Sequence, residues 1–443
     1  MFTTPLFRLA GALSLAVGCL ASAQAQPQAG ASGQPASTFR IQGVDDAWRA
    51  ALPIDAHAAT KAYLARLPAD VVARSNAYFE GGYWLQLWNF IAGLAVAALL
   101  LMTRPSTAFR DWAAARLKRP LLRDAAYGAV YAAAGWVLTL PLGIYEGFVR
   151  EHAYAMATQS FGAWFIEQLT ALGVAVLITA LAVALLYAVL RRVGANWWLW
   201  GTGVAGVLLV LGVAVAPVWI APLFNTYKPV EEGAVKTAVL RMARANGVPV
   251  DNVYEFDASR QTTRVSANVS GLFGTASVRL NDNLLRRASE AEIRAVMGHE
   301  IGHYAMNHIP KSLLMFGAVL MFGFLFAQGA MRRLLARFGQ RWGLAGVHDV
   351  ASLPLLVAVF SVYFFAATPV LNSITRTQET EADLWGLNLA RDPHGEAEVL
   401  LKLVEYRKAD PGVLEEVIFF THPGTRTRIY NAMRWREQML AKP

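Results

Sequence analysis

The segment that decides the fold is Ser289-Glu-Ala-Glu-Ile-Arg-Ala-Val-Met-Gly-His-Glu-Ile-Gly-His-Tyr-Ala-Met-Asn307. Ser289 with Glu292 three residues later forms the capping-box pattern, in which the two side chains satisfy the free N–H groups at the start of a helix. Pro310 follows soon afterwards, as is common beyond the end of a helix. The sequence therefore predicts one helix over residues 289–307.

Two histidines of this segment, His299 and His303, are four residues apart. On a helix this spacing puts both on one face, where both imidazoles can reach one Zn²⁺ ion at about 2.0–2.1 Å. Glu300 lies one step further round the helix and can take a proton from water at the metal without binding the metal itself. The pattern predicts one half of a catalytic zinc site.

The other half of such a site needs a third protein ligand. The run 376–383, Arg-Thr-Gln-Glu-Thr-Glu-Ala-Asp, places Glu379 and Asp383 one helical turn apart. We expect Glu379 to be the third ligand. Asp383 is expected to accept a hydrogen bond from the non-ligating nitrogen of a zinc histidine, which fixes the tautomer of that ring. Glu381 is expected on a solvated helix face.

Further aromatic side chains lie near these two runs. His422, followed by Pro423, is a candidate donor to the oxyanion that forms when water attacks a peptide carbonyl. His308, five residues past His303, is expected to face away from the metal and to be structural. The pattern assigns no role to Tyr304.

The composition is that of a polytopic membrane protein: the 443 residues are 55% hydrophobic and 16% charged. The formal net charge is +9, but Lys and Arg gather at the ends of apolar runs, where a bilayer requires them. The sequence has no basic stripe with interleaved aromatic residues of the kind that indicates nucleic-acid binding. Cys19 is the only cysteine, so a metal must be held by histidine and carboxylate, and an intramolecular disulfide is excluded.

Six apolar stretches are long enough to cross about 30 Å of hydrocarbon as helices. They are residues 83–102, 125–145, 170–190, 198–222, 312–331 and 351–372. The polar blocks 223–311 and 373–443 lie on one side of the membrane, because two spans separate them. The predicted fold class is mainly α, with about six membrane helices and a catalytic domain built from two separate segments.

We divide the chain into residues 1–25, 26–60, 61–222 and 223–443. The first part has the apolar run and small residues of a secretory signal peptide, with an uncleaved first membrane helix as the alternative. The second is predicted to be a linker, because residues 26–38 are rich in Gln, Pro, Gly and Ser. The third is an N-terminal membrane domain, and the fourth is a zinc peptidase domain that includes the last two spans.

Arginine and lysine follow the first, third and fifth spans, in loops that lie on one side of the membrane. These residues are Arg104, Arg110, Arg116, Lys118, Arg119, Arg123, Arg191, Arg192, Arg332, Arg333, Arg337 and Arg341. The positive-inside rule makes this side cytoplasmic. It places both polar blocks outside the cytoplasm, as a cleaved signal peptide also requires.

Further motifs extend over roughly residues 60–435. They are Leu140-Pro141, Ile144-Tyr145, Phe148-Val149, Glu151, Ile220-Ala-Pro-Leu-Phe-Asn225, Pro229-Val-Glu-Glu-Gly233, Val278-Arg-Leu-Asn-Asp-Asn-Leu-Leu285, and His422-Pro423 with Arg428. Together with the 289–307 and 376–383 segments, they resemble the type I CaaX prenyl endopeptidases and their bacterial relatives. That family consists of polytopic zinc proteases that trim the C-terminal tripeptide of prenylated proteins.

The resemblance implies that His299, His303 and Glu379 hold one Zn²⁺ per chain, with Glu300 as general base and His422 as a transition-state donor. It implies membrane helices that enclose a chamber, with a zincin-like catalytic domain at its rim. It also implies a short sheet whose edge strand, within residues 263–280, binds a polypeptide substrate as an added strand.

The chain departs from the family at the start of this edge. Ser266 stands where the family usually has Asn, and Arg264 stands where it has His. Asn268, two residues on and therefore on the same face of a strand, is a candidate substitute. Ser266, Asn268 and Arg428 are the predicted substrate-binding residues.

The sequence thus predicts a zinc-dependent endopeptidase of the bacterial inner membrane that cleaves membrane-associated or exported polypeptides. One alternative is a broad-specificity quality-control protease with the same site. Another is a transporter or scaffold with a structural zinc, which would require charges lining a path through the spans. Family analogy favours a cytoplasmic catalytic face, against the charge argument. The sequence predicts no oligomeric state.

Overall fold

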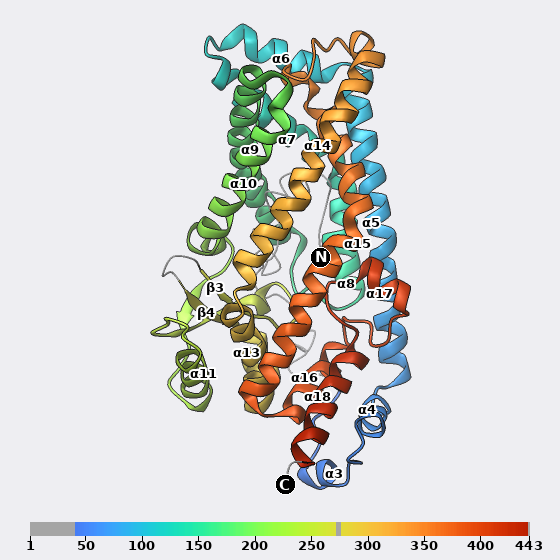
Figure 1. Ribbon diagram of the computed structural model, residues 1–443, viewed down its shortest axis with the longest axis vertical. Coiled ribbons are helices and arrows are strands. Elements are labelled where there is room, and N and C mark those ends of the chain that lie inside the picture. Colours follow the sequence, from blue (N-terminus) through green and yellow to red (C-terminus); the bar gives the residue numbers. More distant parts are fainter. Residues whose placement is uncertain (1–39, 272–275, 442–443) are drawn as a thin grey trace.

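The structure is a computed structural model that describes residues 40–271 and 276–441. The predicted signal peptide, Cys19 and the first part of the predicted linker lie outside the described residues. The long axis of the molecule is formed by a bundle of helices, and the small sheet and the C-terminal helices lie towards one end of it (Figure 1).

The described part of the predicted linker contains helices. α3 (Asp46–Ala50) and α4 (Ala56–Leu64) begin after the N-cap residues Asp45 and Asp55, whose carboxylates accept backbone N–H groups of the first turn. Tyr63 of α4 is fully buried in a core shared with the C-terminal helices. The predicted linker is therefore partly helical beyond residue 45, where Asp45 and Asp55 act as helix caps.

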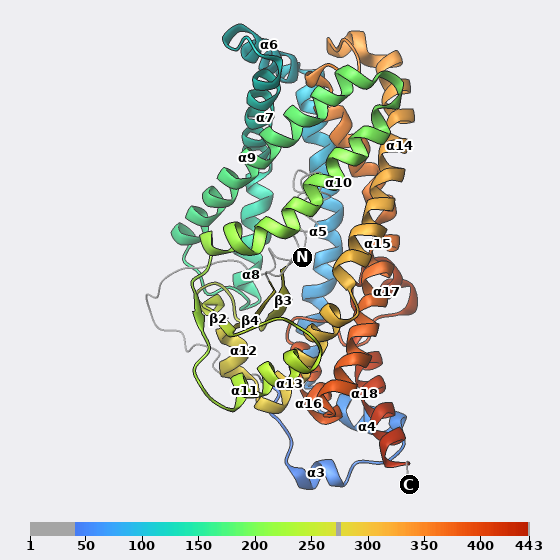
Figure 2. The same ribbon diagram turned by 60° about the vertical axis from the view of Figure 1, so that its left-hand side comes forward.

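Each of the six predicted spans lies within or overlaps one long helix. These helices are α5 (Ala69–Met102), α7 (Pro120–Ile144), α9 (Phe161–Val193), α10 (Trp197–Val215), α14 (His308–Trp342) and α15 (Leu353–Ala390). Among the described residues, five continuous helical segments are long and apolar enough to cross a membrane. The count is five because α9 and α10 belong to one segment of 63 residues, Phe161–Leu223. A turn at Gly194–Asn196 joins the two helices, which pack against each other (Figure 2).

The outer faces of these helices are apolar. Leu177 is 72% exposed and Trp219 is 73% exposed. Soluble monomers rarely expose apolar surface on this scale, whereas a bilayer covers it. α15 differs from the others, since 67% of its most apolar window is buried by the rest of the protein. It is the central helix of the bundle.

The basic loops lie together at one end of the bundle. α6 (Pro105–Arg116) carries Arg110, whose Nη1 is 2.7 Å from Oδ2 of Asp349. Arg191 Nη2 is 2.5 Å from Oδ2 of Asp124. Figure 1 shows α6 at the opposite end of the molecule from α13. The structure therefore separates the basic loops from the polar blocks.

A mixed sheet of four strands has the order β1-β2-β4-β3. The strands are β1 (Tyr227–Pro229), β2 (Val253–Phe256), β3 (Ala267–Ser270) and β4 (Ser277–Asn281). β2 and β4 are parallel, and the other two pairs are antiparallel. Apolar residues of the sheet pack against α11 (Ala234–Ala245) and α13 (Glu290–Ala305). β3 is an edge strand and lies within the predicted segment 263–280.

The predicted helix over 289–307 is α13, and both hydrogen bonds of its capping box are formed. Nζ of Lys402, in α16 (Pro393–Leu403), lies 2.6 Å from Oε1 of Glu292, the glutamate of the capping box. This ion pair connects the start of α13 to the C-terminal region. Asn307 ends the helix in the left-handed conformation, with φ of 56°. The chain then turns directly into α14, and Pro310 lies in its first turn. The remaining α-helices of the described residues are α8 (Arg150–Ala153), α12 (Asp282–Arg287), α17 (Val413–Phe419) and α18 (Thr425–Leu440).

The sixth predicted span and the second polar block form one element. α15 continues through Pro369 to Ala390, so the helix that begins among apolar residues also carries Glu379 and Asp383. The sequence of α15 changes from apolar to polar along its length, but the helix does not end where this change occurs. This single rigid element carries the two carboxylates towards α13.

α13 and α15 cross in backbone contact at two glycines. A Cβ atom on Gly386 would lie 2.8 Å from the backbone nitrogen of His299, and one on Gly298 would lie 3.0 Å from the carbonyl oxygen of Gly386. Small residues at a helix crossing allow the backbones to approach closely. This contact places the acidic face of α15 directly against the histidines of α13.

Candidate metal centre

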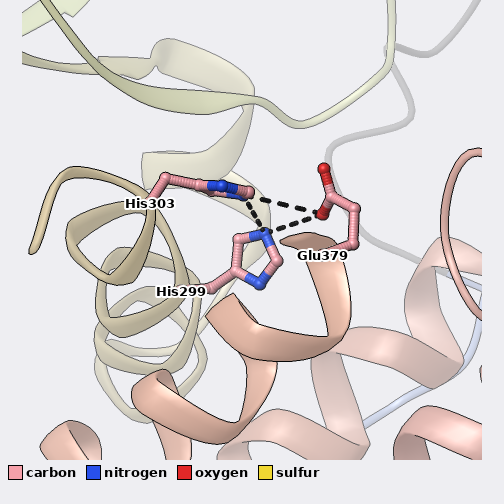
Figure 3. A group of neighbouring side chains, drawn as sticks. All are labelled: His299, His303 and Glu379. Atoms are coloured by element: carbon pink, nitrogen blue, oxygen red, sulfur yellow. Dashed lines mark hydrogen bonds and ion pairs between the residues drawn. The ribbon is translucent and has the colours of Figure 1, made fainter. Parts of the chain in front are cut away.

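Three side chains from the two polar blocks converge on one point (Figure 3). Oε2 of Glu379 lies 3.1 Å from Nε2 of His299 and 3.6 Å from Nε2 of His303. The two Nε2 atoms are 3.0 Å apart. The prediction that Glu379 joins the histidine pair thus agrees with the geometry, although two membrane helices separate them along the chain.

These donor atoms fit a metal ion. Ligands at about 2.0–2.1 Å in a tetrahedral site are separated by about 3.3 Å, close to the three distances found here. Oε2 of Glu379 is buried and accepts no hydrogen bond of good geometry from the described residues. A buried carboxylate oxygen in this state is costly unless a cation satisfies it. Two imidazoles and one carboxylate are the donor set of many catalytic zinc sites with an open fourth position.

Asp383 contacts the ring nitrogen of His299 that does not point into the donor cluster, as predicted. Its Oδ1 lies 2.8 Å from Nδ1 of His299. Arg428 of α18 donates to the same carboxylate from Nε at 2.8 Å and from Nη2 at 2.6 Å. All three side chains are buried. The ring of His299 is therefore fixed by a charged pair that presents its Nε2 to the metal position.

His308 does not face away from the site, contrary to the prediction. Its Nδ1 lies 2.8 Å from Nδ1 of His303, and its Nε2 lies 2.9 Å from Oε2 of Glu381. The prediction assumed a continuous helix, but the break at Asn307 turns the chain back and reverses the direction of the next side chain. Glu381 is likewise more than a solvated carboxylate, because it ends this hydrogen-bonded chain. Both histidines of the motif thus have their second nitrogen held.

Glu300 lies beside the donor cluster on α13. Burial raises the pKa of its carboxyl group, while the positive charge of Arg407 acts in the opposite direction. A carboxylate with a raised pKa is a better acceptor for a proton from water than an ordinary surface glutamate. The environment is that of a general base.

His422 joins the same cluster from the loop before α18. Its Nε2 lies 3.1 Å from Oε2 of Glu379, and its Nδ1 lies 3.0 Å from Oγ1 of Thr421. Burial lowers the pKa of His422 to about 4, so the ring is neutral at neutral pH. If the Thr421 hydroxyl donates to Nδ1, then Nε2 carries the proton and can donate it to a ligand.

Ser266 and Asn268 lie on the edge of the sheet, as predicted. Asn281 donates its backbone N–H to the carbonyl oxygen of Ser266 at 2.9 Å. Alternation along an antiparallel ladder then puts the main-chain groups of Ala267 and Val269 on the side away from β4. Oδ1 of Asn268 is buried with no hydrogen-bond partner among the described residues. This strand offers both backbone and side-chain groups to an added strand.

Arg428 has a different environment from the one expected of a substrate-binding residue. It is buried, and its guanidinium is directed at Asp383 in a bidentate contact. The geometry therefore favours a positioning role behind His299. Spacing along the sequence could not reveal this pairing, because the two residues lie on different helices.

Arg264, where the family usually has His, is also explained by its contacts. Its Nη2 lies 2.5 Å from Oε2 of Glu151 and contacts the hydroxyl of Tyr78. The guanidinium connects the segment that leads into β3 to the membrane helices. No motif predicted this contact.

Replacing Asp383 with Asn is expected to weaken zinc binding by about 10- to 100-fold, the usual cost of losing a hydrogen-bond partner of a metal histidine. The substitution also removes the nearer of the two carboxylates that pair with the buried Arg428, leaving only Glu396 at 3.8 Å, which destabilises the fold. Competition with a chelator of known affinity measures the first effect, and thermal unfolding measures the second. Unchanged zinc affinity would refute the positioning role of Asp383.

Comparison with known protein families covers nearly the whole chain. A family model described as peptidase family M48 matches residues 229–436, the part that holds the donor cluster. A second model, described as CAAX prenyl protease N-terminal, five membrane helices, matches residues 55–226. Residues 229–436 thus match peptidase family M48. It is a membrane metalloendopeptidase that resembles the CaaX prenyl proteases, and these matches favour this interpretation over a transporter or scaffold.

Proteins similar to this chain occur in bacteria and eukaryotes. The protein named uncharacterized metalloprotease YhfN of Bacillus subtilis is 29% identical over 75% of this chain and 79% of its own length. The probable CAAX prenyl protease 1 of Schizosaccharomyces pombe is 29% identical over 43% of this chain and 40% of that protein. CAAX prenyl protease 1 of Saccharomyces cerevisiae is 25% identical over 57% of this chain and 59% of that protein. The alignments thus span about half of the yeast proteins.

The fold is shared with a solved structure. The crystal structure of S. mikatae Ste24p matches with a TM-score of 0.69 over 82% of this chain and 89% of that one, at 19% sequence identity. The predicted fold class, membrane helices with a small sheet, is confirmed. The match to peptidase family M48 implies a catalytic metal.

Proposed function

We propose that this peptidase uses one zinc ion held by His299, His303 and Glu379 to hydrolyse polypeptides at the membrane face. The observation that carries the proposal is the convergence of these three donors beside Glu300. A structural zinc site is closed by four protein ligands, whereas three ligands leave a position for water. A neighbouring carboxylate with a raised pKa then has a catalytic use.

A zinc ion bound in such a site supplies a Lewis acid that polarises a peptide carbonyl and makes water more acidic. Glu300 takes the proton of the attacking water and returns it to the departing amine. His422 donates from Nε2 to the carbonyl oxygen of the scissile bond as negative charge develops there. Asp383 and His308 keep the two histidine rings in place during turnover.

The proposed substrate is a membrane-associated or exported polypeptide that binds in an extended conformation. It adds to β3 and forms main-chain hydrogen bonds with Ala267 and Val269, whose groups face away from β4. Ser266 and Asn268 are the proposed side-chain contacts beside this backbone. α15 supports a membrane-associated substrate, because one helix runs from the apolar bundle into the site.

We infer that the protein resides in a bacterial inner membrane with its catalytic end outside the cytoplasm. The inference is supported by the basic loops at the end of the bundle opposite to α13. Labelling engineered cysteines with a membrane-impermeant reagent in intact cells, one after Arg191 and one after Lys408, tests this orientation. Labelling of the loop after Arg191 alone would reverse the proposed topology.

The test of the function compares zinc content and peptidase activity in the wild type and in the Glu300→Gln variant. Loss of the general base is expected to lower kcat by about 10²–10⁴-fold with one zinc ion per chain retained. Glu290→Gln is the matched control, since Glu290 lies on the same helix with an exposed side chain. Activity that survives in Glu300→Gln, or is lost equally in Glu290→Gln, would contradict the proposal.

A further inference from the structure

Arg407 lies in the segment between α16 and α17, and its two neighbours are anchored on opposite sides. The hydroxyl of Tyr406 accepts a hydrogen bond from the backbone N–H of Val265 at 3.4 Å, just before β3. Nζ of Lys408 lies 2.7 Å from Glu80 of α5 and 2.7 Å from Glu415. The backbone at Arg407 is thus held between the edge strand and the membrane bundle.

The guanidinium of Arg407 is half-buried and has no hydrogen bond or ion pair within 40–271 and 276–441. Nearby arginines differ: Arg264 contacts Glu151, Arg287 contacts Glu405, and Arg428 contacts Asp383. Removing a charge from water is costly unless a counter-ion compensates it. A half-buried guanidinium without a counter-ion can therefore pair with an anionic ligand from outside the chain.

This guanidinium is close enough to the metal centre for its charge to act on groups there. Its charge lowers the pKa of Glu300 and of His422. Burial and the charge of Arg428 lower the pKa of Arg407 itself, and the charges of Glu379 and Asp383 act in the opposite direction. These carboxylates have other partners: Asp383 is engaged by Arg428 and His299, and Glu379 belongs to the donor cluster. None of them is within ion-pair distance of Arg407.

We propose that Arg407 binds a carboxylate of the polypeptide substrate. The planar guanidinium donates two parallel hydrogen bonds to a carboxylate, a geometry that a peptide amide cannot reproduce. Two groups of a polypeptide offer this chemistry, the C-terminal carboxylate and an acidic side chain. The inference rests on the proposed function, because it assigns a specificity contact to the same site.

The experiment measures kcat/KM on three versions of one short peptide. The first has a free C-terminal carboxylate, the second has a C-terminal amide, and the third has the amide together with one glutamate on the C-terminal side of the cleaved bond. The wild type is expected to prefer one or both carboxylate peptides over the plain amide by about 10- to 100-fold, the usual contribution of a charge-assisted hydrogen bond. The preferred peptide identifies the source of the carboxylate.

In Arg407→Gln this preference is expected to disappear, mainly through a higher KM for the carboxylate peptides, so that kcat/KM falls further on these peptides than on the plain amide peptide. Arg407→Lys is expected to restore part of the preference. Arg426→Gln is the matched control, because Arg426 is exposed and pairs with Asp410. Zinc content and thermal unfolding verify that each variant is folded. In the inactive Glu300→Gln background, the dissociation constants of the same peptides should show the same preference without turnover.

Equal kcat/KM of the wild type on all three peptides would overturn the proposal. So would an equal loss on all three in Arg407→Gln, which indicates a structural role. The proposed function fails in a different way, namely if the wild type and Glu300→Gln cleave every peptide at the same rate.

Discussion

Glu379→Gln is expected to abolish zinc binding at micromolar zinc and to lower peptidase activity to background. The reason is that Oε2 of Glu379 lies within 3.6 Å of Nε2 of both His299 and His303. Glutamine keeps the shape of the side chain but removes the negative charge that holds a cation. Since losing only a hydrogen-bond partner of a ligand costs about 10- to 100-fold in affinity, losing a ligand costs more. Equilibrium dialysis with zinc, followed by metal analysis, measures the effect.

Glu381→Gln is the comparison for this variant, because the residue is on the same helix two positions away. Glu381 contacts His308, which in turn contacts His303. Its loss is expected to weaken zinc binding by no more than about 10-fold. Equal losses in the two variants would mean that Glu379 is not a ligand.

Gly386→Val is expected to destabilise the protein and to abolish activity without touching a side chain of the site. A Cβ atom at this position would be 2.8 Å from the backbone nitrogen of His299, a contact that neither helix can relieve by a rotamer change. Overpacking of this kind costs about 1–3 kcal/mol or more. The shift of α15 would also carry Glu379 and Asp383 away from the histidines. Thermal unfolding in detergent and zinc content measure the two consequences.

Gly317→Val is the matched control, since a Cβ on Gly317 of α14 meets no atom within 4 Å. This variant is expected to retain the stability, zinc content and activity of the wild type. If Gly386→Val behaved in the same way, the close helix crossing would not be what assembles the site.

The donor cluster of the candidate metal centre was predictable from the sequence, because the spacing of its residues follows local helical geometry. His299 and His303 are one helical turn apart, and Glu379 with Asp383 repeats that spacing on a second helix. The hydrogen bond from His299 to Asp383 follows from the same helical geometry. The sequence did not reveal that the two helices are in contact. That contact depends on the glycines at the crossing, and no motif identifies these glycines as a helix contact.

The contacts that support the site were not predictable in this way. His308 points back at His303 because Asn307 adopts φ of 56°, and helical periodicity gives no warning of such a break. The pairing of Arg428 with Asp383 joins α18 to α15, which depends on tertiary packing alone. Arg407 is preceded and followed by ordinary polar residues, and only its lack of a partner in the described structure distinguishes it.

The membrane helices were predictable from hydropathy, but their ends were not. Apolar composition located six stretches, whereas α5 begins at Ala69 and α15 continues to Ala390, well outside the bilayer-length windows. The helices extend beyond the apolar stretches because helix propensity and capping, and not hydropathy, set where a helix ends. The same effect hid α3 and α4 in the predicted linker, because Asp45 and Asp55 indicate helix starts as well as polar loops.

The most direct test of a site assembled across two membrane helices is a diffraction experiment at the zinc absorption edge on crystals of the full chain. One anomalous peak is expected, within about 2.0–2.2 Å of His299 Nε2, His303 Nε2 and an oxygen of Glu379. A peak bonded to the histidines but not to Glu379, or a peak elsewhere in the protein, would contradict the account.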